Sequence, residues 1–216
     1  VALLTSNYLF CEDLFENPEV RKPVPIITVP SHPLFGMEIL PLFIANDIQT
    51  GFRKVYRNNL LYPVISIIDP GIAVLTPDET TAETGMAILS VSTESVISKI
   101  TSEFTNTYAL KSIDLIFKHL ENCYRDNRNA ALRYPLSIAS VLAGAAFSLS
   151  SLSVALSIST AIASVTGCAV EKPMGIMLPH VMEFNLTSSP GKYVQMAKVM
   201  DEDVKEITVI EAAIKA

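Results

Sequence analysis

A stretch without a single charged residue, from Tyr134 to Val170, constrains the fold of this chain more than any other feature. About 20 apolar residues suffice to cross a bilayer as a helix, so a membrane span is one interpretation. However, serines and small residues are scattered through the stretch, no Lys/Arg cluster follows it, and the chain has no Trp to mark a membrane interface. The stretch therefore predicts the buried centre of an all-helical domain, and a membrane span is not favoured.

The composition is apolar for a globular chain, with 50% hydrophobic and 18% charged residues. We therefore expect apolar surface to be covered by protein partners or a homo-oligomer. A net charge of −6 without any basic stripe argues against nucleic-acid binding. The three cysteines, Cys11, Cys123 and Cys168, have neither disulfide-framework nor zinc-site spacing, which indicates a reducing intracellular compartment, either cytoplasm or organelle matrix.

Local patterns divide the chain near Pro70. Before it, β-branched runs bounded by prolines predict strands, the first of them buried and parallel, at Pro25–Pro30, Leu42–Ala45 and Val64–Ile68. After it, the segment from Thr76 to Glu79 is typical of a capping box and starts a helix at about Pro77. Helices are expected over Thr80–Ile100, Asn106–Cys123, Asn129–Phe147 with a continuation through Gly167, Met174–Glu183, Pro190–Met200 and Ile207–Ala216.

An ordered series of segments resembles the iron-containing (group III) alcohol dehydrogenases. The segments follow the family's order with nearly its spacing and cover essentially the whole chain: Pro25–Pro30, Ile67–Pro70, Thr84–Met86, Phe104–Ile113, Leu142–Ser148 and Leu178–Asn185. The resemblance implies a dehydroquinate synthase-like fold of class α/β + all-α. Residues 1–70 would be part of a parallel-sheet nucleotide-binding domain and residues 71–216 the helical domain. It also implies a fragment, because the family's glycine-rich nucleotide-binding turn would lie before Val1.

The resembled enzymes bind Fe²⁺ or Zn²⁺ through one Asp and three His, and a further His handles protons. The resemblance places the metal positions on side chains that cannot ligate: Ala87, Val91, Leu156 and Val170. The position of the catalytic His is Thr160, whose hydroxyl does not titrate near neutral pH. The sequence therefore predicts no metal site and no catalytic residue at the family's positions.

The loop that approaches the cofactor in the family also differs here. Within Pro30–Glu38, the residues Pro30, Gly36 and Glu38 match the family's loop and are interpreted as vestigial cofactor-binding positions. Bulky apolar side chains replace the family's small residues at Leu34, Phe35 and Met37. Dinucleotide binding is therefore not expected, and we predict that the chain uses no cofactor.

Three functional hypotheses follow. The first is a non-catalytic homologue that acts as a scaffold or structural subunit of a protein assembly. The alternative is an NAD(P)-dependent, metal-dependent alcohol dehydrogenase that interconverts alcohol and aldehyde. Its metal ligands would then be residues other than those at the assigned positions, or its active site would be completed by another chain. The third is a protein that binds a small apolar ligand in the emptied cleft.

Overall fold

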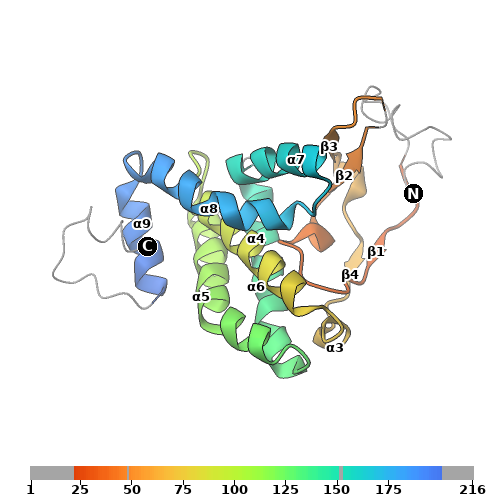
Figure 1. Cartoon of the computed structure of the whole chain (residues 1–216), viewed down its shortest axis with the longest axis horizontal. Coiled ribbons are helices and arrows are strands. Elements are labelled where there is room, and N and C mark those ends of the chain that lie inside the picture. Colours follow the sequence, from red (N-terminus) through yellow and green to blue (C-terminus); the bar gives the residue numbers. More distant parts are fainter. Residues whose placement is uncertain (1–21, 48, 151–152, 201–216) are drawn as a thin grey trace.

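The computed structural model describes residues 22–47, 49–150 and 153–200. Short strands and turns lie at one end of a bundle of helices, and the last described helix lies at the other end (Figure 1). The short elements are β1 (Ile27–Thr28), η1 (Met37–Ile39), β2 (Leu42–Asn46), β3 (Arg53–Arg57), η2 (Asn59–Leu61), β4 (Ile65–Ser66) and α3 (Pro70–Ala73). The bundle consists of α4 (Asp78–Ile97), α5 (Glu103–Arg125), α6 (Ala130–Leu149), α7 (Val154–Thr166), α8 (Glu171–Leu186) and α9 (Pro190–Val199).

The predicted strands exist but are shorter, and one further strand accompanies them. β1 pairs in parallel with β4, whereas β2 forms an antiparallel hairpin with β3, which was not predicted. The expectation that the first strand is buried is wrong, because Ile27 is 58% exposed. Within the described residues β1 has a single neighbouring strand, so much of its surface remains open.

The expected helices agree with the structure except at one point. α4, α5, α8 and α9 correspond to four predicted helices, and the helix predicted over Ile207–Ala216 lies outside the described residues. The continuation from the α6 region through Gly167 is wrong, because the backbone becomes extended at Ser150 and a new helix begins at Val154. Gly167 does end α7, and it adopts the left-handed conformation typical of a C-terminal cap (φ 74°).

The new helix begins where it does because two side chains accept its first amide protons. The hydroxyl Oγ of Ser153 accepts from the amide of Leu156 at 2.8 Å. From α4, the carboxylate of Glu94 accepts from the amides of Val154 (2.8 Å) and Ala155 (3.1 Å). These bonds satisfy N–H groups that have no partner within the helix itself.

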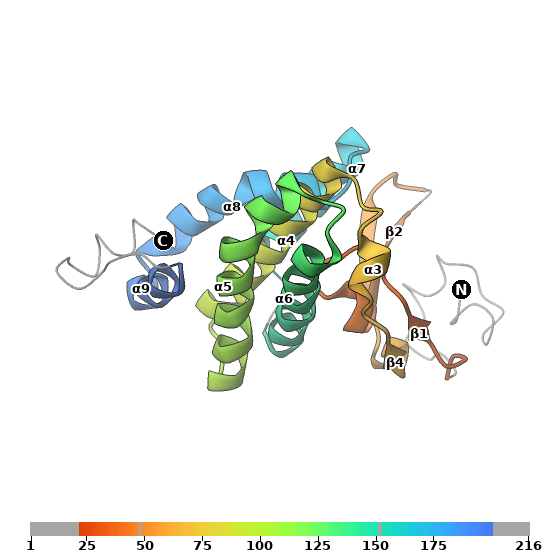
Figure 2. The same cartoon turned by 90° about the horizontal axis from the view of Figure 1, so that it is seen from below.

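The uncharged stretch begins in α6, which packs against α5 and α4 as a core helix (Figure 2). Among the described residues, α6 alone is long and apolar enough to cross a membrane, and half of its most apolar window is buried inside the protein. Near its start lies Arg133, fully buried, which donates to the backbone oxygens of Asn127 (2.8 Å) and Thr76 (3.1 Å). These contacts are those of a helix packed within a protein core.

The α/β segment is joined to the bundle by a contact of two glycines, between the loop before η1 and α6. Gly36 adopts a left-handed conformation (φ 83°), and a Cβ on Gly144 would lie 2.6 Å from the Cα of Gly36. The hydroxyl Oγ of Ser140, one helical turn before Gly144, accepts from the amides of Leu34 (3.1 Å) and Gly36 (2.9 Å). Only glycine on both sides permits so close an approach.

Replacing Gly144 with alanine tests this joint. The added methyl group would collide with the backbone of Gly36, so we expect G144A to lower the free energy of unfolding by about 1–3 kcal/mol in urea denaturation. The matched control is G191A in α9, where an added Cβ meets nothing within 4 Å. Equal stability of the two variants would show that the loop does not rest on α6.

Candidate functional site

The four positions that the resemblance assigns to metal ligands converge in the structure. Ala87 and Val91 lie one helical turn apart on α4, and α7 and α8 both pack against α4. Leu156 follows the start of α7, and Val170 is the residue before α8. All four belong to one hydrophobic core cluster, with exposures between 0% and 7%. The sequence reasoning therefore identified residues that do share one place in the fold.

The donor chemistry of this place does not fit a divalent metal ion. Alkyl side chains offer no lone pair, and no group of three or more His, Cys, Asp or Glu that could hold a metal occurs among the described residues. The three histidines do not converge there either. His32 lines a narrow pocket with Pro30 and Glu38, whereas His180 is exposed on α8.

Thr160 lies in α7, one turn after Leu156, and is 5% exposed. Its hydroxyl Oγ1 donates to the backbone oxygen of Leu156 at 2.7 Å. This bond within the helix uses the only proton that the side chain can give. The hydroxyl of Thr160 is therefore committed to its own helix.

Glu94 is a buried carboxylate near these residues that the sequence reasoning missed. It follows Val91 by three residues on α4 and is 8% exposed. Burial raises its pKa, while the side chain of Ser153 and the amides of Ala155 and Val154 act in the opposite direction. Its oxygens are engaged at the start of α7, so it holds the break between α6 and α7. The available signal was that Glu94 is the only acid between Glu83 and Glu103.

The three predicted cofactor-binding positions, Pro30, Gly36 and Glu38, make different contacts in the structure. Gly36 packs against α6, and Glu38 accepts a hydrogen bond from Ser140 at 2.9 Å through Oε1. The backbone oxygen of Glu38 also accepts from the hydroxyls of Thr28 (2.8 Å) and Ser66 (2.7 Å), which joins both parallel strands to η1. Pro30 lines the narrow pocket that also contains His32 and Glu38. A role for the three residues in cofactor binding stays a prediction.

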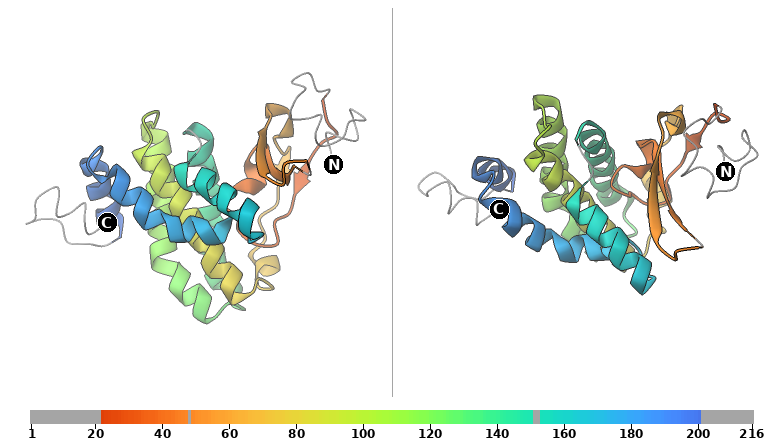
Figure 3. Two further views of the ribbon diagram at one scale, coloured as in Figure 1. Left: turned by 45° about the horizontal axis from the view of Figure 1, so that its top comes forward. Right: turned by 90° about the horizontal axis from the view of Figure 1, so that it is seen from above.

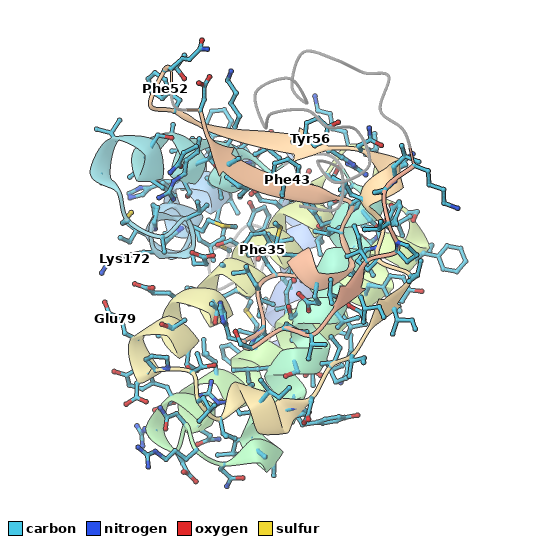
Figure 4. All side chains as sticks on the ribbon, turned by 90° about the vertical axis from the view of Figure 1, so that its right-hand side faces the viewer. Phe35, Phe43, Phe52, Tyr56, Glu79 and Lys172 are labelled. Carbon is cyan, nitrogen blue, oxygen red and sulfur yellow. The ribbon has the colours of Figure 1, made fainter. Side chains whose placement is uncertain are left out.

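A cleft of about 490 Å³ opens between this loop, the β2–β3 hairpin and the start of α8. Among the residues that line it are the three bulky residues noted in the sequence, Leu34, Phe35 and Met37. Val170, one of the metal positions, lines the same cleft. Figure 4 looks toward this end of the molecule and shows Phe35 below the hairpin strand that carries Phe43. The loop that resembles the family's cofactor loop and one position that the resemblance assigns to a metal ligand therefore meet at one cleft, most of whose lining residues are apolar.

Short strands thus lie on a bundle of helices, and the cleft opens between the antiparallel hairpin, the loop before η1 and the start of α8. The chain belongs to the Fe-containing alcohol dehydrogenase family, whose C-terminal model matches residues 81–216. The predicted family and the predicted fold class are thereby confirmed. The position of the domain boundary near Pro70 stays a prediction.

Three similar proteins illustrate the relationship. An NADPH-dependent butanol dehydrogenase of Clostridium saccharobutylicum is 29% identical over 87% of this chain and 48% of its own length. A 1,3-propanediol dehydrogenase of Klebsiella pneumoniae is 30% identical over 89% of this chain and 50% of its own. A crystal structure of a 1,3-propanediol oxidoreductase superimposes with a TM-score of 0.86 at 27% identity, over 90% of this chain and 51% of that one. The chain thus spans about half the length of these relatives.

The expectation that no cofactor is involved is wrong for a member of this family. The matched family is iron-containing, and the butanol dehydrogenase is named for its dependence on NADPH. The expectation was based on two local features, the alkyl side chains at the assigned metal positions and the bulky residues of the loop Pro30–Glu38. These features concern only the residues that carry them. They say nothing about the remaining surface that a dinucleotide contacts.

Introducing a carboxylate at a metal position tests whether the place is sealed from water. We expect A87D to lower the free energy of unfolding by about 3 kcal/mol or more, because an unpaired charge would be buried among alkyl groups. Urea denaturation in the presence of EDTA measures the loss. The control A161D places the same charge on the exposed side of α7 and should change stability by less than about 0.5 kcal/mol.

The buried carboxyl of Glu38 predicts a pH dependence of stability. Burial raises its pKa above the ordinary value for a glutamate, so the folded state holds the proton more tightly than the unfolded chain. The resulting stability is present in acid and is lost as the pH rises from 4.5 through the folded pKa. The gain of E38Q over wild type, measured by urea denaturation, should therefore increase from pH 4.5 toward 8. A pH-independent difference would contradict this.

Proposed function

We propose that this chain is a non-catalytic member of the iron-containing alcohol dehydrogenase family that acts as a scaffold or structural subunit in a protein assembly. The observation that carries the proposal is the convergence of Ala87, Val91, Leu156 and Val170 in one buried apolar cluster. The family's chemistry requires a Lewis acid to polarise the alcohol oxygen, and these side chains give such an ion no ligand.

The energetics of this cluster support the same conclusion. Each buried Leu or Val side chain contributes roughly 1.5–3 kcal/mol to stability, so the substituted positions strengthen the core. Donor side chains left without a metal would instead be buried polar groups that cost free energy. A chain selected for its fold and its contacts rather than for hydride transfer would accumulate this pattern.

Exposed apolar surface supports a role in assembly. The pair β1–β4 and its flanks expose five aliphatic side chains by about half of their surface, namely Ile27, Val29, Val64, Ile65 and Ile67. On the outer side of α8, Ile176 and Phe184 are 63% and 79% exposed. Patches of this kind on a folded chain are typical of interfaces.

The alternative is an NAD(P)-dependent, metal-dependent alcohol dehydrogenase. The observation that favours it is the similarity to the butanol and 1,3-propanediol dehydrogenases. This alternative requires that ligands come from residues other than the four aliphatic positions, for example from another chain.

An activity measurement separates the two. The purified chain is supplied with Fe²⁺ or Zn²⁺, NAD⁺ or NADP⁺, and 1-butanol or 1,3-propanediol, and reduced nicotinamide is followed by its absorbance. We expect no turnover above a control without protein, and light scattering after size exclusion should show a mass above that of one chain. Alcohol-dependent reduction of the nicotinamide, retained after repeated purification, would overturn the proposal in favour of the dehydrogenase.

A further inference from the structure

The cleft beside Val170 contains a guanidinium group, that of Arg53, which forms no ion pair with any described residue. Arg53 is the first residue of β3, is partly buried and lines the cleft of about 490 Å³. Its backbone amide donates to the hydroxyl of Ser164 at 2.8 Å, which fixes the start of the strand on α7. Within the part of the chain that the structure describes, its side chain forms neither a hydrogen bond nor an ion pair.

The hairpin register determines where this side chain points. Arg53 is paired with Asn46, and Val55 with Ile44, so these four residues share one face of the hairpin. Ile44 and Val55 pack against the hydrophobic core, and both Asn46 and Ile44 line the cleft. The guanidinium and the Asn46 side chain therefore lie together on the inward face, at the polar end of an apolar cleft.

We propose that this cleft binds a small amphipathic monocarboxylate, with the carboxylate on Arg53 and the aliphatic tail along the apolar walls. The guanidinium can hold a carboxylate through two parallel hydrogen bonds, and the adjacent amide of Asn46 supplies a further donor. The tail would lie along Leu34, Met37 and Val170. The volume lies within the range of small-molecule sites, roughly 300–1,000 Å³.

The charges of the cleft favour a single negative charge over a phosphate. Glu171, at the start of α8, also lines the cleft and opposes the binding of a dianion. Arg53 is the only cationic side chain among the residues that line the cleft, and most of the others are apolar. A dinucleotide would bring two phosphates to this one cation. The site goes beyond the proposed scaffold role and does not depend on it.

The test uses sodium octanoate as the probe, below its micelle concentration, titrated into the full chain by calorimetry. We expect octanoate to bind, and R53Q to weaken its affinity by about 10-fold or more, since hydrogen bonds to charged groups are the stronger class. R53Q replaces a side chain that has no hydrogen-bond or ion-pair partner among the described residues, so we expect the fold to be unchanged. Circular dichroism verifies this. The matched control R57Q alters the exposed other end of the same strand and should bind like the wild type.

Two further measurements distinguish the site from nonspecific adsorption of a fatty acid. E171Q should bind octanoate a few-fold more tightly, because a like charge is removed from the cleft. Across butanoate, hexanoate and octanoate, the affinity should rise about threefold or fourfold for each added methylene. Equal affinity of R53Q and wild type, or an affinity independent of chain length, would overturn the proposal.

The outcome is independent of the proposed function. If the wild type does not bind octanoate, the carboxylate site is refuted, and the result says nothing about alcohol oxidation. Turnover of alcohol would contradict the scaffold proposal without removing the carboxylate site. Tighter binding of NADP⁺ than of octanoate, weakened by R53Q, would instead assign the guanidinium to a nucleotide phosphate and would also overturn the carboxylate proposal.

Discussion

The structure depends on the close contact between the backbones of Gly36 and Gly144. The loop before η1 has few partners of its own, and α6 supplies both the surface on which it rests and the hydroxyl of Ser140 that accepts two of its amides. Because this contact fixes the loop, it also fixes Leu34, Phe35 and Met37 as walls of the cleft. The two views of Figure 3 show the consequence, with the strands held at one end of the bundle and α9 at the opposite end.

Burying Glu38 at the contact between the loop and α6 costs free energy, and the geometry of that contact explains why. Glu38 must be buried there because its backbone oxygen receives the hydroxyls of both parallel strands, and one carboxylate oxygen, Oε2, has no hydrogen-bond partner. A buried oxygen without a partner is expensive as an anion, and the raised pKa follows from this burial. The same residue thus unites β1, β4 and α6 while titrating above the ordinary range of a glutamate.

The sequence predicted what depends on local patterns and missed what depends on distant partners. Proline, capping residues and apolar periodicity located α4, α5, α8 and α9 to within a few residues. The break before α7 was not predictable, because the acceptor of its first amides is Glu94, which lies 60 residues earlier. β3 was missed because its sequence, from Arg53 to Arg57, is largely charged and lacks the apolar run expected of a strand. At the site, the family resemblance led to four residues that do cluster, but nothing local revealed that Arg53 reaches the cleft beside one of them.

If the chain has no metal ligands, as we propose, other contacts must hold the fold together. Three buried polar side chains, Ser140, Glu94 and Arg133, bind backbone amides and carbonyls of other segments. A fold held by such bonds and by apolar packing loses little when the ligands become Ala, Val and Leu, since each replacement adds to the core. The superposition on a 1,3-propanediol oxidoreductase at a TM-score of 0.86 agrees with this view. The cleft is then lined mostly by apolar groups, and the guanidinium of Arg53 becomes the feature that selects a ligand.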